Sequence, residues 1–157
     1  ILGRSIGGAF LVGVAFGAAF FFTHLVWVGT YLGPVPWVAL AGLETLLFGA
    51  GAIPIALAYR WTDRARGRAV LWFVGVPLLV AGLWSVRELM MGSWPYSGFP
   101  WARIGMTQAN GLLPDAASWV GVTGLGFLIV AACACLVQWW RAGGFRRMRG
   151  VLPAAVE

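Results

Sequence analysis

Residues 119–140 read WVGVTGLGFLIVAACACLVQWW, an unbroken run without a charged side chain. A helix needs about 20 predominantly apolar residues to cross a bilayer, so this stretch is long enough to span a membrane. The whole chain of 157 residues has the same character, with 61% hydrophobic residues and 10% charged ones. A typical soluble domain has about 45–50% apolar residues and about 25% charged ones. The composition therefore excludes a soluble globule and a disordered tail, and it indicates an integral membrane protein.

Three further apolar stretches are long enough to cross a bilayer, at about residues 5–32, 35–59 and 69–91. All are continuous runs rather than short segments of alternating polarity, which is the pattern of helices and not of a β-barrel. The sequence therefore predicts an all-α membrane protein with four transmembrane helices. Because residue 1 is Ile and no signal peptide precedes the first span, we expect this chain to be part of a larger polytopic domain.

The arginines give the four spans an orientation. The net charge is +6, and the chain contains arginine but no lysine. Apart from Arg87 and Arg103, every arginine lies before the first span, between the second and third, or after the fourth. Cytoplasmic segments of membrane proteins are enriched in Lys and Arg, so we expect both ends of the chain to be cytoplasmic. These tracts do not alternate with aromatic residues as in a nucleic-acid-binding stripe, so no nucleic acid is expected. They comprise Arg4, Arg60, Arg64, Arg66, Arg68, Arg141, Arg146, Arg147 and Arg149.

Glycine is abundant, at 23 residues, and glycines four residues apart recur on the first span. The pairs are Gly3 with Gly7 and Gly13 with Gly17. Small residues let membrane helices approach closely, which predicts tight packing within one bundle, with a dimerisation face as the alternative. Pro77 lies inside the third span, where we expect a kink.

The connection between the third and fourth spans, residues 92–118, is too long for a simple turn. It contains Trp94, Tyr96, Phe99 and Trp101 together with several prolines. We expect this outer loop to lie at the membrane interface and to line a groove that lipid can enter. The alternative is a structural cap that covers the helix ends.

Ionisable residues inside the spans are costly in hydrocarbon and indicate function. Glu88 lies near the outer end of the third span, and we predict that Arg103 descends from the loop to pair with it. Adjacent helical residues do not face each other, so Arg87 is the poorer partner. Glu44 lies deeper in the second span, where no cation is expected at its depth. His24, the single histidine, is expected to be a hydrogen-bonded residue at the interface.

The residues needed for covalent or acid–base catalysis are missing. One histidine and no lysine cannot complete a Ser-His-Asp, Cys-His or Ser-Lys arrangement. Cys133 and Cys135 lie in the middle of the fourth span without a base nearby, and no metal-ligand pattern or phosphate-binding loop is present. We therefore expect no catalytic residue, no metal and no cofactor in this chain.

Four short motifs succeed one another in the outer half of the chain. They are Leu83-Trp84 with Glu88, Gly98-Phe-Pro-Trp101, Gly105-x-x-Gln108 and Gly121-Val-x-Gly124. In this order and spacing they resemble the bacterial apolipoprotein N-acyltransferase family. The resemblance covers nearly all of the chain, which would match the third to sixth helices of the family's membrane domain.

The resemblance implies a multi-pass protein of the bacterial plasma membrane, with a nitrilase-like domain on the outer side. Such enzymes transfer an acyl chain from a phospholipid to the N-terminal diacylglyceryl-cysteine of a lipoprotein, through a thioester on a Glu-Lys-Cys triad. Since this chain has no lysine, we expect the nitrilase-like domain to be absent from it and the chain alone to be inactive. Its implied partners are phospholipid and lipoprotein substrates, the membrane, and the missing segments of its own polypeptide.

The resemblance also implies which residues meet the substrates. The tryptophan of the GFPW block maps to Trp101, which we expect to form a wall and gate for acyl chains entering from the outer leaflet. The residues after Glu88 depart from the family pattern, because the family often has x-x-Arg-Gly there and this chain has Leu-Met-Met-Gly. Arg87 or Arg103 would then replace the family arginine. The predicted substrate-binding residues are Glu88, Gly98, Phe99, Pro100, Trp101, Arg103 and Gln108.

Two other functions are compatible with the sequence. The first is a non-catalytic membrane scaffold that anchors a polyprenol-phosphate mannose synthase, a glycosyltransferase, on the cytoplasmic side through the basic tracts. The second is a small transporter or channel, which would need polar residues at mid-membrane on several spans, whereas Glu44 is the one strong candidate.

Overall fold

The computed structural model describes residues 2, 5–63, 68–94, 98–111 and 113–143. Within these residues the chain is helical and contains no strand. The helices are α1 (Ile6–His24), α2 (Val26–Leu32), α3 (Pro34–Thr62), α4 (Val76–Met91) and α5 (Ala116–Arg141). A π-helical turn (Leu71–Gly75) leads into α4, and two 3₁₀ turns (Pro100–Ala102 and Ile104–Gln108) form part of the outer loop.

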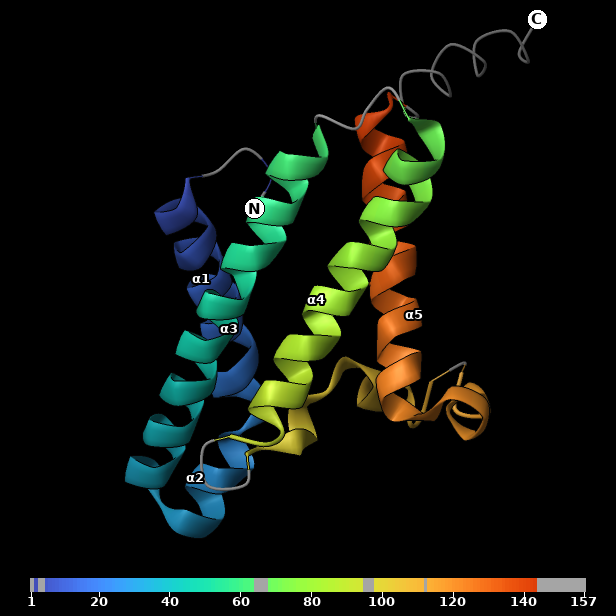
Figure 1. Ribbon diagram of the computed structural model, residues 1–157. Coiled ribbons are helices and arrows are strands. Elements are labelled where there is room, and N and C mark those ends of the chain that lie inside the picture. The colour runs from blue at the N-terminus through green and yellow to red at the C-terminus, as the bar shows by residue number, and fades with distance from the viewer. Residues whose placement is uncertain (1, 3–4, 64–67, 95–97, 112, 144–157) are drawn as a thin grey trace, which may run out of the picture.

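Four of these segments are long and apolar enough to cross a membrane. They are α1, α3, the π-helical turn with α4, and α5, which confirms the expected all-α architecture with four transmembrane helices. α1 lies along α3, α5 lies along α4, and α3 and α4 join the two pairs (Figure 1). The start of α1 and the end of α5 lie at one end of the bundle, and the loop between α4 and α5 lies at the other (Figure 1). Which end faces the cytoplasm stays a prediction.

The first apolar stretch, predicted to span residues 5–32, is divided near its C-terminal end into two helices. α1 ends at His24, and Leu25 has φ −94° and ψ 12°. The Thr23 hydroxyl donates to the carbonyls of Ala19 and Phe20 at 2.7 and 2.9 Å, a type of back-bonding that bends helices. α2 then packs against the start of α3, and the chain reverses at Gly33, where φ is +90°.

Close packing between α1 and α3 depends on glycine. A Cβ at Gly13 would lie 2.8 Å from Cβ of Ala52 and 2.9 Å from Cα of Gly49. A Cβ at Gly17 would lie 3.2 Å from Cα of Thr45. This second glycine pair confirms tight packing within the bundle. By contrast, a Cβ at Gly7 has nothing within 4 Å, and Gly3 lies outside the described residues.

The predicted irregularity at Pro77 takes the form of the π-helical turn before it. The N–H of Val76 bonds to the carbonyl of Leu71, and Pro77, the next residue in this pattern, has no N–H. The carbonyl of Trp72 accepts instead from Nε2 of Gln138 on α5 at 2.9 Å. Gln138 is fully buried, so this bond satisfies two groups that the membrane could not solvate.

Arg141 joins three helical segments at the same end of the bundle. Its Nη1 donates to Oε1 of Gln138 at 2.9 Å, and its Nη2 forms an ion pair with Asp63 after α3. The guanidinium carbon lies 4.6 Å from the ring centre of Trp72 and 5.4 Å from that of Tyr59. The remaining arginines after α5 lie outside the described residues, as do Arg4, Arg64 and Arg66.

Candidate functional site

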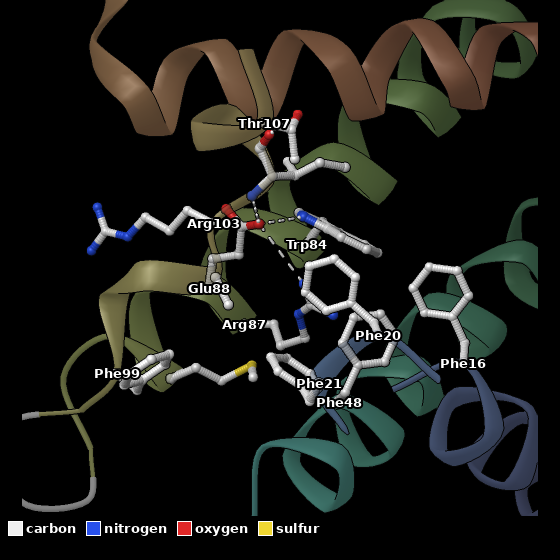
Figure 2. Close-up of a pocket in the computed structure, with 13 residues that line it drawn as sticks. Phe16, Phe20, Phe21, Phe48, Trp84, Arg87, Glu88, Phe99, Arg103 and Thr107 are labelled. Carbon is white, nitrogen blue, oxygen red and sulfur yellow. Dashed lines mark hydrogen bonds and ion pairs between the residues drawn. The ribbon is translucent and has the colours of Figure 1, made fainter. Parts of the chain in front are cut away.

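A pocket of about 80 Å³ lies at the loop end of the bundle. Its floor and walls come from α1, α3 and α4, and the outer loop covers one side (Figure 2). Most of the lining is apolar, with two arginines and one glutamate. The lining residues are Phe16, Phe20, Phe21, Phe48, Trp84, Arg87, Glu88, Met91, Phe99, Ala102, Arg103, Ile104 and Thr107.

Glu88 connects α4 to the outer loop with a single oxygen atom. Its Oε1 accepts the indole N–H of Trp84 at 2.9 Å and the backbone N–H of Ile104 at 2.9 Å. The side chain is 5% exposed, so both bonds lie away from solvent. The carboxylate therefore holds the 3₁₀ turn that begins at Ile104 against the helix (Figure 2).

The predicted ion pair between Glu88 and Arg103 is wrong. Arg103 donates from Nη1 to the hydroxyl of Thr123 on α5 at 3.2 Å, and its side chain extends away from the phenylalanine rings (Figure 2). The backbone explains the difference, because the N–H of Ile104 takes the position at Glu88 that a side-chain cation was expected to fill. The loop is attached to the third span as predicted, through a different donor.

Arg87 is buried in a corner formed by two perpendicular aromatic rings. Its guanidinium carbon lies 3.8 Å from the ring centre of Trp84 and 4.0 Å from that of Phe48. The stem of the side chain crosses α3 at Gly51, where a Cβ would overlap it. Nη2 lies 3.9 Å from Oε1 of Glu88, a distance beyond a hydrogen bond, in agreement with the prediction that adjacent helical residues pair poorly.

Arg87 also supplies the cation that was not expected near Glu44. Glu44 is 1% exposed, and its carboxylate interacts electrostatically with Arg87. The expectation of no cation at this depth is wrong because helical side chains lean toward the N-terminus of their helix. Since α4 starts at the opposite end of the bundle, Arg87 leans inward, toward Glu44.

Of the four residues in the GFPW block, 98–101, Phe99 lines the pocket and the other three do not. Gly98 has φ +70°, and a Cβ there would overlap the backbone of Gly92 and Ser93. Phe99 donates its N–H to the carbonyl of Met91 at 2.8 Å and lines the pocket. Pro100 starts the first 3₁₀ turn. Trp101 is 66% exposed and lies outside the pocket lining, and its role as a wall and gate for entering acyl chains stays a prediction.

Glycines in the remaining motifs let the loop approach α5. A Cβ at Gly105 would overlap the carbonyl oxygen of Val122, and one at Gly126 would lie 3.2 Å from Cγ2 of Ile104. Gly121 has φ +69° and marks a kink within α5. Gln108, the last residue of the Gly105 motif, donates to the hydroxyl of Thr107 at 3.3 Å. Tyr96 lies outside the described residues.

The described residues contain no group of three potential metal ligands. Cys133 and Cys135 are free thiols on the exposed surface of α5. His24 stacks on Phe20 with ring centres 5.2 Å apart. None of these side chains lines the pocket.

Comparison with known proteins identifies the family. Residues 1–135 match the family described as apolipoprotein N-acyltransferase N-terminal domain. This chain belongs to that family. It is 32% identical over 158 residues to the apolipoprotein N-acyltransferase of Methylococcus capsulatus, a match that covers 99% of this chain and 31% of that relative. Similar relatives are those of Geobacter metallireducens (32% over 134 residues, 83% of this chain and 25% of the relative) and Mycolicibacterium smegmatis (36% over 146 residues, 87% and 22%).

The chain therefore spans between about a fifth and a third of the length of these curated relatives. No solved structure matches it. Family membership and the four apolar helices together assign it to the inner membrane as a multi-pass protein.

Sequence reasoning missed two parts of the pocket. The first is the phenylalanine wall of α1, although Phe16 and Phe20 are four residues apart and so share a helix face. The second is the depth of Arg87, for which Gly51 on the facing helix was the available signal. Neither signal is specific without knowledge of which helices are neighbours.

Proposed function

We propose that this chain is the lipid-binding portion of an apolipoprotein N-acyltransferase membrane domain. The full protein would transfer an acyl chain from a phospholipid to the N-terminal diacylglyceryl-cysteine of a lipoprotein. Family membership supports this assignment, and so does the position of the pocket, which adjoins the loop that carries the GFPW motif.

The observation that carries the proposal is the combination of an apolar wall with charged groups at one end of the bundle. Phe16, Phe20 and Phe48 offer contact surface for an acyl chain, while Arg87 and Glu88 border the same space. Holding a lipid at this position next to a nucleophile of the outer domain would raise its effective concentration there. The chemistry itself would belong to a domain with the Glu-Lys-Cys triad.

In this proposal Trp101 serves as a wall and gate for acyl chains that approach the loop from the outer leaflet. Its indole is exposed at the level of the loop, where an amphipathic ring is suited to contact lipid or an adjoining domain. The residue thus remains a proposed substrate contact together with Gly98, Pro100, Phe99, Arg103 and Gln108.

The test is acyl transfer by the full-length protein carrying Trp101→Ala. We expect the rate to fall about tenfold or more, the size of effect produced by losing roughly 1.4 kcal/mol. Trp119→Ala is the matched control, because Trp119 is 89% exposed at the start of α5 and belongs to no proposed contact. Transfer of a radiolabelled acyl chain to a lipoprotein, with membrane insertion checked by fractionation, measures the effect.

Equal rates of acyl transfer for the wild type, Trp101→Ala and Trp119→Ala would show that Trp101 does not contribute to the site. A protein that inserts normally but transfers no acyl chain in its wild-type form would instead contradict the proposed function.

The scaffold alternative would place a polyprenol-phosphate mannose synthase on the basic tracts. Arg141 is engaged with Asp63 and Gln138 within the bundle, which leaves it poorly placed to bind a partner. Loss of membrane association of such a synthase when the full-length protein is deleted would favour the scaffold.

A further inference from the structure

We propose that Arg87 binds the phosphate group of a lipid whose acyl chain occupies the adjacent phenylalanine-lined pocket. The inference rests on the proposed function and deepens it by naming the residue that recognises the lipid headgroup. Of the two arginines that the sequence left open as replacements for the family arginine, it selects Arg87 on α4, and it names phosphate as the group bound.

Two aromatic rings and a glycine surround the Arg87 side chain. Trp84 and Phe48 cover it at 3.8 and 4.0 Å from the guanidinium carbon to the ring centres, and Gly51 accommodates the stem. The two rings are nearly perpendicular to each other, with an angle of 86° between their planes, so the guanidinium lies in an aromatic corner. These contacts and Gly51 fix the position of the cation beside the pocket.

One donor of the Arg87 guanidinium, Nε, is buried without a hydrogen-bond acceptor within the described part of the chain. The side chain as a whole is only 9% exposed. Glu88 lies 3.9 Å from Nη2, and the oxygen concerned already accepts two N–H groups. Buried donors that remain unpaired are costly, so an oxyanion that accepts from them would stabilise the site.

Charged side chains of both signs lie around the pocket. Glu44 and Glu88 lie near Arg87, but Arg103 also lines the pocket and has a buried Nε without a partner. Arg87 and Arg103 are the two arginines of the sequence that lie outside the basic tracts. Both line the same cavity, and Arg87 is the one whose guanidinium lies against the phenylalanine-lined wall.

The site lies close to the loop end of α4. Arg87 precedes the last residue of α4 by four positions, which corresponds to about 6 Å along the helix axis. A phosphate at this depth would leave the attached chain beside Phe16, Phe20 and Phe21. Arginine binds phosphate through two parallel N–H···O bonds, which a neutral alcohol cannot replace.

The experiment compares dodecyl phosphate with dodecanol as probes for the purified full-length protein in detergent. Calorimetric titration measures both dissociation constants for the wild type, Arg87→Gln and Arg68→Gln. We expect the wild type to prefer dodecyl phosphate by about tenfold or more, since hydrogen bonds to charged groups contribute at least that factor. Arg87→Gln should lose this preference and still bind dodecanol. Arg68→Gln, which removes an exposed arginine near the start of the third span, should keep it.

Inorganic phosphate distinguishes a lipid headgroup site from a general anion site. If it competes with dodecyl phosphate at similar concentration, the occupant is a free anion and the lipid proposal is overturned. An unchanged preference in Arg87→Gln also overturns the proposal, because Arg87 would then merely balance the charges of Glu44 and Glu88.

Arg87→Lys keeps the proposal testable if the glutamine variant does not fold. Lysine retains the positive charge but lacks the planar edge, so we expect a smaller preference for the phosphate probe than in the wild type. An equal preference would contradict bidentate recognition. If the phosphate preference does not depend on Arg87 but the protein still transfers acyl chains, this inference is wrong and the proposed function is unaffected.

Discussion

At the scale of single residues, Glu88 is one of the contacts that attach the outer loop to the bundle. One carboxylate oxygen receives N–H groups from Trp84 in its own helix and from Ile104 in the loop. A buried acceptor shared in this way couples the position of an aromatic pocket wall to the position of the loop. The same residue therefore serves the fold and the shape of the site.

Glu88→Gln should loosen the loop. The amide retains one acceptor oxygen, but it is neutral, and its NH₂ group cannot accept from either donor. We expect a loss of about 1–3 kcal/mol in the local stability of the loop. Faster proteolysis of residues 98–107 from the loop side, in protein reconstituted into vesicles, measures this loss. Asp115→Asn is the control, since Asp115 is an exposed carboxylate at the other end of the loop. Equal cleavage rates in the two variants would contradict the account of Glu88.

At the scale of helices, contact between α1 and α3 depends on the missing side chains of Gly13 and Gly17. We expect Gly13→Val to lower the midpoint of thermal unfolding, because a Cβ there would press on Ala52 and Gly49 and overpacking costs about 1–3 kcal/mol. Gly7→Val makes the same chemical change in the same helix where nothing lies within 4 Å. The midpoint of thermal unfolding is measured for each variant in detergent. Equal shifts of the midpoint in Gly13→Val and Gly7→Val would mean that glycine affects stability only through helix propensity.

The junction of α4 and α5 depends on a polar contact. Gln138→Leu keeps the side-chain size but removes the amide that donates to the carbonyl of Trp72 and accepts from Nη1 of Arg141. We expect a loss of about 1–3 kcal/mol of stability, because both groups lie in or near the bundle interior. Cys133→Leu is a suitable control on the exposed face of α5. Chemical denaturation in mixed micelles compares the variants, and a neutral effect of Gln138→Leu would show that water satisfies the carbonyl.

The sequence predicted the helices well and their irregular points less well. Span length and the absence of charge are properties of a continuous stretch, so the four helices follow from composition alone. No proline or glycine lies at the break near Leu25, so the sequence did not predict it. The Thr23 hydroxyl bonds to backbone carbonyls in the preceding turn, and such bonds bend helices. The pocket could not be predicted in detail, since Phe16, Phe48 and Arg87 come from three helices whose relative rotation is a property of packing.

At the scale of the whole molecule, the functional proposals require the loop to face away from the cytoplasm. The start of α1 and the end of α5 lie on one side of the bundle, which agrees with an even number of crossings (Figure 1). The arginine tracts between residues 60 and 68 and after α5 predict that this side is cytoplasmic. Lipid and lipoprotein substrates of the outer leaflet would then reach the pocket from the loop end.

Cysteine labelling of intact cells tests this orientation. In a background with Cys133→Ala and Cys135→Ala, we expect Ser93→Cys and Asp115→Cys to react with a membrane-impermeant maleimide. Arg68→Cys and Ala142→Cys should react only after the membrane is permeabilised, because both positions lie at the basic ends of their helices. The opposite pattern would place the pocket at the inner leaflet, where no outer catalytic domain could reach a lipid bound at Arg87. The acyl-transfer proposal would then be wrong, since it needs the pocket and the nucleophile on the same side, and a lipid bound at Arg87 would have no part in acyl transfer.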